Sequence, residues 1–255
     1  MRTIVICNRK GGCGKSSTCV AMFSYLMQIA KKRTLLLDFD SQCNSSYAVG
    51  ADMEKSTMYD VLRGNAEISA AMQEVMPNLF GAYVIPASNA MVDIDNSIDD
   101  VAINVKTELQ KLYDTVDYII IDTPPSLGTL TTLALLVADQ VVLPVLPDAF
   151  SLQGIGMVYE IIQHIHRPEL DIAGILITRY NDRLLLNRKI LEMLQETADA
   201  MGTRVFDTAI RESVVVREAE FMQIPLFSYD NKLRFGATQD YYNFCQEMFG
   251  EGGKA

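Results

Sequence analysis

The clearest chemical signal in the sequence is a run of eight residues near its start, Lys10-Gly11-Gly12-Cys13-Gly14-Lys15-Ser16-Ser17. Glycines let a backbone turn tightly and bring its N–H groups close to an anion. A lysine after the last glycine adds a positive charge, and the hydroxyl that follows can bind Mg²⁺. This pattern predicts a phosphate-binding loop in which Lys15 contacts the β and γ phosphates of a nucleotide and Ser16 contacts the metal.

The run departs from the usual phosphate-binding spacing, G-x-x-x-x-G-K-[ST], at its first position. Arg9 stands where that spacing requires a glycine, and a second lysine, Lys10, follows it. A cation at such a position can stabilise charge on a transferred phosphoryl group, as an arginine finger does. The alternative is an ordinary surface lysine beside the loop.

Three aspartates follow apolar runs in other parts of the chain. Asp38 and Asp40 come at the end of the run 34–38, and Asp122 comes directly after 118–121. Ligands of open parallel sheets bind at the carboxyl ends of the strands, so we expect all three carboxylates to converge on the loop. Nucleotide hydrolysis needs a metal ligand, which Asp122 suits, and a residue that positions water, which Asp38 or Asp40 suits. The alternative for each aspartate is a turn-capping role.

The elements that must position these residues alternate between short apolar runs and helical patterns. This alternation predicts an α/β fold with a single doubly wound, mostly parallel sheet and helices on both faces. Strands are predicted at 3–7, 34–38, 82–85, 118–121, 140–145, 173–178 and 204–206. Helices are predicted at 17–30, 57–63, 68–76, 93–114, 130–138, 152–164, 184–201 and 236–249, with a loop and helix over 210–224.

The composition is that of a globular protein of one domain. The chain has 255 residues, of which 49% are hydrophobic and 21% charged, and we expect one domain over 1–250 and a frayed tail over 251–255. Its five cysteines have no metal-type spacing, which favours reduced thiols and a cytoplasmic location. The net charge of −10 does not suggest a protein covered in phosphate-binding lysines, although a local basic patch is compatible with it.

Three motifs together carry a resemblance to a known family. They are Lys10 to Ser17, the segment Leu-Leu-Leu-Asp38-Phe-Asp40-Ser-Gln42-Cys-Asn44, and the segment Ile-Ile-Ile-Asp122-Thr-Pro-Pro-Ser126. The chain resembles the ParA/MinD family of deviant-Walker-A ATPases, in the SIMIBI class of P-loop NTPases. Within that family it is most similar to small ParA/Soj-type partition ATPases, and the similarity runs nearly from end to end.

The resemblance implies a role for each motif residue. Lys10 would be the signature lysine that reaches across an ATP-sandwich homodimer to the partner's phosphates, and Lys15 and Ser16 would bind the phosphates and Mg²⁺. Asp40 would orient the attacking water, while Asp38 and Asp122 would hold the water shell of the metal. Catalysis would therefore depend on Lys10, Lys15 and Asp40. The nucleotide would contact Lys10, Gly11, Gly12, Cys13, Gly14, Lys15, Ser16 and Ser17.

The adenine site is expected from the resemblance near 178 and 210. Its candidates are Thr178, Arg179 and Arg211, with ordinary loop residues as the alternative. Cys13 occupies a position where valine is common. A thiol with a lowered pKa at a helix N-terminus is conceivable there, against the simpler reading of a tolerated variation.

The chain departs from the ParA pattern where DNA binding is expected. Glu212 and Val215 stand at positions of arginines, and Glu220 replaces a proline. Because non-specific DNA affinity comes mainly from phosphate neutralisation, these changes weaken the expectation of DNA binding. A basic patch could still form from Arg179, Arg183, Arg188, Lys189, Arg217, Lys232 and Arg234.

Two functions are compatible with these motifs. The first is a Mg²⁺-dependent ATPase that dimerises with ATP and segregates plasmid or chromosomal DNA with a ParB-like adaptor, on the nucleoid if DNA is bound. The second is a nucleotide-gated scaffold that positions a protein cargo and binds DNA weakly. Membrane anchoring is not expected, because the C-terminal pattern around Tyr241 and Phe249 is apolar on one face without being basic.

Overall fold

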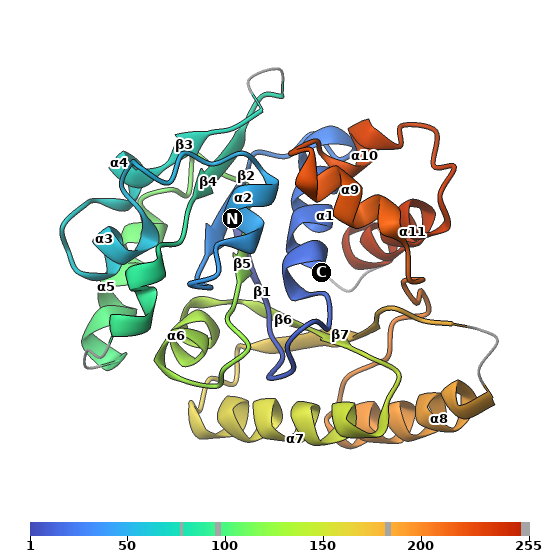
Figure 1. Cartoon of the computed structure of the whole chain (residues 1–255). Coiled ribbons are helices and arrows are strands. Elements are labelled where there is room, and N and C mark those ends of the chain that lie inside the picture. The colour runs from blue at the N-terminus through green and yellow to red at the C-terminus, as the bar shows by residue number, and fades with distance from the viewer. Residues whose placement is uncertain (77–78, 95–97, 182–184, 251–255) are drawn as a thin grey trace.

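The computed structural model describes residues 1–76, 79–94, 98–181 and 185–250. Within them, a seven-stranded sheet has the order β3-β4-β2-β5-β1-β6-β7 (Figure 1). The strands are β1 (Arg2–Ile6), β2 (Thr34–Asp38), β3 (Gln73–Glu74), β4 (Ala82–Ile85), β5 (Tyr118–Asp122), β6 (Gln140–Val145) and β7 (Asp171–Ile177). All neighbouring strands are parallel except β3, which runs antiparallel to β4. The predicted α/β fold class is confirmed.

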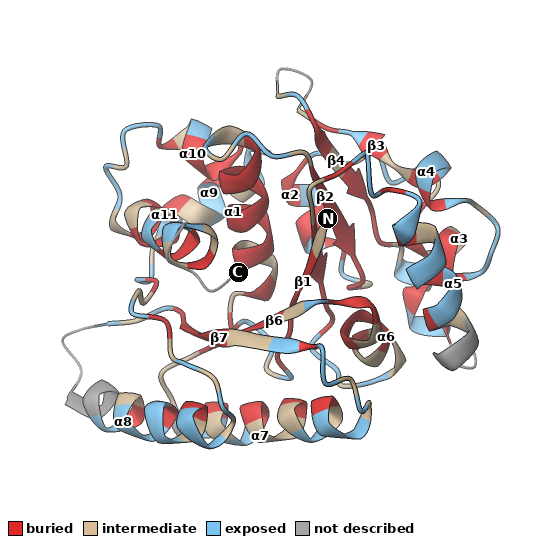
Figure 2. Ribbon diagram, turned by 180° about the vertical axis from the view of Figure 1, so that it is seen from behind, coloured by how far each residue is buried: buried red, intermediate tan, exposed pale blue. Residues whose placement is uncertain are grey.

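Helices cover both faces of this sheet (Figure 1). They are α1 (Lys15–Gln28), α2 (Asn44–Ala48), α3 (Met58–Leu62), α4 (Ile68–Ala71), η1 (Asn89–Asp93), α5 (Ile98–Gln110), α6 (Thr129–Val137), α7 (Ala149–His164), α8 (Leu185–Ala200), α9 (Val214–Phe221), α10 (Leu226–Tyr229) and α11 (Gly236–Phe249). The central strands are buried between the two helical layers (Figure 2).

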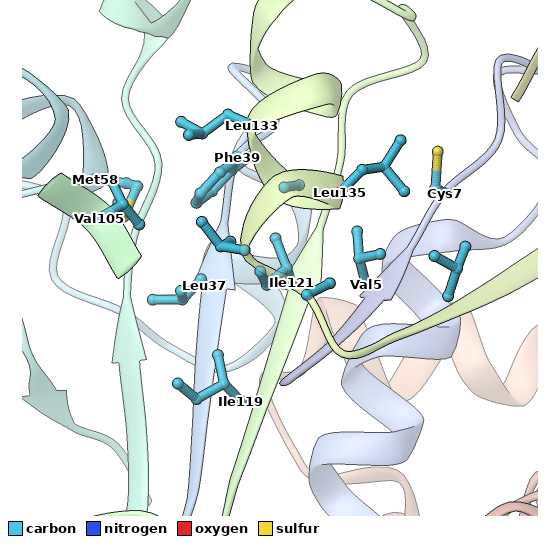
Figure 3. Close-up of a cluster of buried hydrophobic side chains, with 14 of the residues drawn as sticks. Val5, Cys7, Leu37, Phe39, Met58, Val105, Ile119, Ile121, Leu133 and Leu135 are labelled. Atoms are coloured by element: carbon cyan, nitrogen blue, oxygen red, sulfur yellow. The ribbon is translucent and has the colours of Figure 1, made fainter. Parts of the chain in front are cut away.

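Two hydrophobic clusters hold the layers to the sheet, one on each face. Successive side chains of a strand point to opposite faces, so Val5 joins one cluster while Ile4 and Ile6 join the other. The first cluster packs strand residues such as Ile119 and Ile121 against Val105 of α5 and Leu133 of α6 (Figure 3). It also includes residues of α7 and α8. The second packs the opposite face against α1, α9, α10 and α11. The shared sheet therefore fixes α1 and α9 relative to the strand ends.

Three predicted elements differ in the structure. The helix predicted over 68–76 is wrong beyond Ala71, because 73–74 form the edge strand β3. The long helix predicted over 93–114 is shorter, since a 3₁₀ turn ends at Asp93 and α5 ends at Gln110. The strand predicted over 204–206 is only an isolated bridge between Val205 and Ile175. Short apolar runs fit helix and strand patterns equally well, and long-range pairing decides between them. The tail predicted over 251–255 lies outside the described residues.

Candidate nucleotide-binding site

The loop between β1 and α1 has the backbone shape that its glycines predict. Gly12 has φ 72° and Gly14 has φ 84°, both in the left-handed region that favours glycine. Gly14 is also the N-cap of α1, and a Cβ added there would lie 3.5 Å from Cγ2 of Thr178. Glycine has no side chain to cap the first turn, so the N–H groups at the start of α1 remain available to an anion.

A buried asparagine ties this loop to the neighbouring strand β6. Asn8 donates a hydrogen bond from Nδ2 to the carbonyl of Pro144 at 2.6 Å, and its Oδ1 accepts one from the Lys10 backbone N–H at 3.0 Å. A Cβ on Gly154 of α7 would come within 3.1 Å of the same Oδ1. Asn8 therefore positions the loop. Its importance was not anticipated from the sequence, where no motif marks it.

Thr178 plays a similar positioning part at the end of β7. Its side chain is buried, and its hydroxyl shares its one proton between the carbonyls of Cys13 at 2.8 Å and Val145 at 3.0 Å. The hydroxyl is thus engaged with the phosphate-binding loop itself. Direct contact between this hydroxyl and a base stays a prediction.

The two lysines of the loop differ in their surroundings. Lys15 is buried, and its Nζ donates to the carbonyl of Lys10 at 3.3 Å. Lys10 is partly exposed and forms an ion pair with Asp148, the residue that caps α7. In the single chain, Lys10 is therefore held by its own subunit at the mouth of the loop. No motif in the sequence indicates this pairing with Asp148.

The sheet register brings the three predicted aspartates to one edge. Asp38 of β2 pairs with Asp122 of β5, which also pairs with Ile6 of β1. Asp38 accepts hydrogen bonds from the Asp40 N–H at 2.9 Å, and from the N–H and the hydroxyl of Ser46 at 2.9 and 2.6 Å. Asp40 accepts one from the backbone of Gln42 at 3.0 Å. The register thus places Asp38 and Asp122 side by side at the strand ends next to β1, which leads into the loop, and Asp40 follows two residues after Asp38. Convergence of all three carboxylates on the loop stays a prediction.

Asp122 is the carboxylate with an unsatisfied environment. It is fully buried, and neither of its oxygens has a hydrogen-bond partner within the described part of the chain. Burial, together with the charge of Asp38, raises the pKa of Asp122 to about 7. The hydroxyl of Ser45 beside it is likewise buried without a partner among the described residues. A cation with its water shell would satisfy these groups, so the site fits Mg²⁺.

The protein supplies only part of a metal's ligands here. Among the described residues there is no group of three or more histidine, cysteine or acidic side chains placed to hold a metal ion. Mg²⁺ is typically bound by one or two protein groups together with waters and substrate phosphates. Ser16 and the two buried aspartates Asp38 and Asp122 are consistent with that mode.

A cleft of about 520 Å³ extends from the loop toward α9. Gly12, Gly14 and Ser17 of the loop segment line it, together with the adenine candidates Thr178, Arg179 and Arg211. Arg179 is exposed and pairs with Glu212 at 2.6 Å, whereas Arg211 pairs with Asp240 at 2.7 Å. Of the predicted nucleotide contacts, the cleft brings together Gly12, Gly14, Lys15, Ser16, Ser17, Thr178, Arg179 and Arg211, whereas Lys10, Gly11 and Cys13 do not line it. A larger cavity of about 690 Å³ lies between α3 and α5 and contains none of them.

The cysteine in the loop is not placed for redox chemistry. Cys13 is fully buried, and burial raises the pKa of its thiol above the ordinary value, against the lowering effect of Lys15. A reactive thiol needs the opposite shift and access to solvent. The redox alternative for Cys13 is therefore wrong, and the residue fills space beneath the loop.

The departures in the expected DNA-binding segment have distinct structural causes. Glu212 is exposed and neutralises Arg179. Val215 is fully buried in the cluster between α9 and the sheet, so an arginine would not fit at this position without disturbing the core. Glu220 lines the nucleotide cleft. Of the basic residues proposed for a patch, Lys189, Arg217, Lys232 and Arg234 are exposed, while Arg183 lies outside the described residues.

Comparisons with known proteins agree with this geometry. Residues 1–172 match the model of a family described as an AAA domain. The chromosome-partitioning ATPase Soj of Treponema pallidum is 33% identical over 258 residues, which cover 99% of each chain. The chromosome partitioning protein ParA of Caulobacter vibrioides is 29% identical, over 97% of this chain and 94% of that protein.

A solved structure shows the same fold. Cobyrinic acid a,c-diamide synthase from Mycobacterium smegmatis, with bound ATP analog and magnesium, has a TM-score of 0.80 and is 25% identical. The similarity covers 99% of this chain and 97% of that chain.

The sheet order, the glycine loop and the strand-end aspartates define a P-loop nucleotide-binding protein of the α/β class. The family model matches two thirds of the chain, and the similarity to Soj covers nearly its whole length. These findings show that the chain belongs to the ParA/MinD family of ATPases. In the part of the chain that the structure describes, no helix is both long and apolar enough to cross a membrane.

Proposed function

We propose that the protein is a Mg²⁺-dependent ATPase that dimerises when it binds ATP and takes part in DNA partitioning with a ParB-like adaptor. The observation that carries this proposal is the buried, unpartnered Asp122 beside the phosphate-binding loop, with Asp38 and Asp40 at the same sheet edge. The partitioning role is supported by the names of the relatives Soj and ParA. Residues 1–250 would act as one ATPase domain, since both hydrophobic clusters share one sheet.

In the proposed mechanism, the backbone of Gly11 to Ser17 and the buried Lys15 bind the phosphates. Ser16, Asp38 and Asp122 would hold Mg²⁺ directly or through water, and the metal would offset charge on the β and γ phosphates. Asp40 would orient the attacking water and accept its proton. Lys10 would leave Asp148 and contact the γ phosphate bound by a second copy of the chain, which links ATP occupancy to dimerisation.

ATP hydrolysis and mass in solution test these roles together. We expect Lys15→Ala to lose ATP binding, because the buried charge at the phosphates is removed. Asp40→Ala should bind ATP and dimerise but turn over at least about a hundredfold more slowly. Lys10→Ala should bind ATP and remain monomeric. Lys55→Ala, at an exposed lysine outside the cleft, is the matched control and should behave as wild type.

Each assignment has an outcome that contradicts it. Unchanged turnover in Asp40→Ala would show that another group positions the water. If ATP induces no dimer in the wild-type chain, the dimerising partition ATPase is excluded.

The second candidate, a nucleotide-gated scaffold for a protein cargo, is favoured by one specific observation. The Arg179–Glu212 ion pair neutralises one of the arginines at this edge of the cleft, which lowers the positive charge available to DNA phosphates. ATP-dependent dimerisation with no DNA binding at physiological salt would favour the scaffold over the partition ATPase.

A further inference from the structure

Glu220 lies on α9 and lines the nucleotide cleft beside Ser17 and Tyr241. It is half-buried, and its Oε1 is completely buried without a hydrogen-bond partner among the described residues. Behind it is a small apolar cavity whose walls include Val20 and Leu226. The carboxyl group is therefore enclosed by apolar groups on its inner side, and the cleft is on its other side.

This environment is unfavourable for a charged group in the empty cleft. Burial raises the pKa of Glu220, and the nearby Ser17 hydroxyl and the charge of Arg217 offset only part of that effect. Glu218, two residues earlier on the same helix, is instead exposed and accepts a hydrogen bond from the Tyr229 hydroxyl at 3.2 Å. A buried polar group without a hydrogen-bond partner lowers the stability of the protein. A ligand in the cleft that donates a hydrogen bond to Glu220 would remove this cost.

The position of Glu220 along the cleft limits which part of a nucleotide it can meet. The phosphate end is fixed by the loop and by the first turn of α1, which contains Ser16 and Ser17. A carboxyl group beside Ser17 would repel phosphate oxygens, so the nucleotide must present donors at this point. The ribose follows the α phosphate directly, and its 2′- and 3′-hydroxyls are adjacent donors that match the two oxygens of a carboxylate. Arg179 and Arg211, the candidates for contact with the base, line the same cleft.

We propose that Glu220 accepts hydrogen bonds from the ribose hydroxyls of the bound nucleotide and thereby selects ribonucleotides over deoxyribonucleotides. This inference depends on the proposed function, since it requires that ATP occupies the cleft. It assigns a specificity role to a glutamate that stands where the sequence pattern predicted a proline.

Equilibrium affinities for ATP, 2′-deoxy-ATP and 3′-deoxy-ATP test the assignment. Wild type should bind ATP about tenfold more tightly than either deoxy analogue, the factor expected for one hydrogen bond to a charged acceptor. Glu220→Ala should weaken ATP binding about a hundredfold, because both hydrogen bonds are lost, and should weaken each deoxy analogue, which keeps one of the two hydroxyls, about tenfold. The three nucleotides should then bind equally well. Glu220→Gln, which keeps one acceptor and the shape, should retain part of the discrimination. Glu218→Ala removes the same charge from an exposed position on the same helix and should keep the wild-type ratio.

The outcomes separate this inference from the proposed function. If ATP binds and Glu220→Ala keeps the wild-type ratio of ATP to deoxy-ATP affinity, the ribose assignment is wrong while the nucleotide site stands. If Glu220→Ala changes the preference for ATP over GTP instead, the carboxyl group contacts the base, which also overturns the assignment. If wild type binds no ATP, or Lys15→Ala binds it equally well, the proposed function fails. Thermal melting of each variant shows that it is folded before its affinities are compared.

Discussion

At the scale of single residues, Asp122 is a buried carboxylate whose negative charge the described side chains do not stabilise. Its side chain is fully buried next to Asp38, which accepts three hydrogen bonds, whereas Asp122 has no partner among the described residues. The two carboxylates are adjacent because β2 and β5 are in register at their ends. Such a pair is unfavourable in the metal-free protein and becomes favourable when a cation is bound.

This arrangement predicts how stability depends on pH. The pKa of Asp122 is raised to about 7 from 3.8, so between these values the folded chain binds a proton that the unfolded chain has lost. The stability of the metal-free protein should therefore fall as the pH rises through this range. Above it, the full free-energy cost of ionising the buried Asp122 should be present. Asp122→Asn should remove that cost and raise the free energy of unfolding at about pH 8 by roughly 1 to 4 kcal/mol.

Urea denaturation of the metal-free protein measures the effect. The difference between Asp122→Asn and wild type should be much smaller at about pH 5 than at about pH 8. Asp207→Asn, at an exposed aspartate, serves as the control and should change stability at neither pH. An equal gain for Asp122→Asn at both pH values would contradict the link to ionisation.

The sequence predicted the residues of the site that lie at strand ends, but not those that hold them in place. Lys15, Ser16 and the three aspartates could be placed together because parallel strands end at one edge of a sheet. Asn8 and Asp148 could not, since their partners Pro144 and Lys10 are far away in sequence and no motif records the contact. Glu220 appeared in the sequence only as a departure from a pattern, and its burial beside the cleft gives that departure a physical meaning.

At the level of elements, the start of α7 links the loop to the helical layer. Asp148 caps this helix by accepting hydrogen bonds from the backbone of Phe150 and Ser151 at 3.1 Å each, and its other oxygen pairs with Lys10. One carboxylate thus serves both the helix and the loop lysine. Movement of Lys10 toward a partner subunit would break the ion pair but need not break the cap.

Two substitutions at Asp148 separate these contributions. Asp148→Ala removes both and should lower the free energy of unfolding by about 1 kcal/mol, the usual cost of losing an N-cap. Asp148→Asn keeps an acceptor for the cap and should cost less, because a partly exposed ion pair contributes little. Urea denaturation at neutral pH measures both. Equal losses for the two variants would mean that the ion pair, rather than the cap, stabilises this junction.

The elements whose bounds the sequence predicted are three mostly buried strands and the last helix. β2, β4, β6 and α11 have the predicted bounds, because their apolar patterns are long or flanked by clear turn residues. The strand β3 is only two residues long and exists because it pairs with β4 at the edge of the sheet. Such an element depends on tertiary contacts that no local pattern specifies.

At the scale of the whole molecule, the distribution of surface charge determines whether the ATP-bound protein can bind DNA. The net charge is −10, and the exposed Arg179 at the edge of the cleft is neutralised by Glu212. The core explains why the neighbouring Val215 is not an arginine, but nothing in the packing requires an acid at Glu212, which is exposed. A single substitution at this surface position can therefore change the local charge without disturbing the fold.

Glu212→Arg should increase ATP-dependent binding of random-sequence duplex DNA. The change adds one cation and releases Arg179, so the slope of log affinity against log salt should steepen by about 2, with roughly tenfold tighter binding at low salt. Fluorescence anisotropy over a salt series measures both quantities. Glu212→Gln, which only releases Arg179, should give about half the change in slope. Glu160→Arg makes the same change in net charge on the exposed face of α7 and is the control. An equal gain from Glu160→Arg would show that net charge, and not this edge of the cleft, determines DNA affinity.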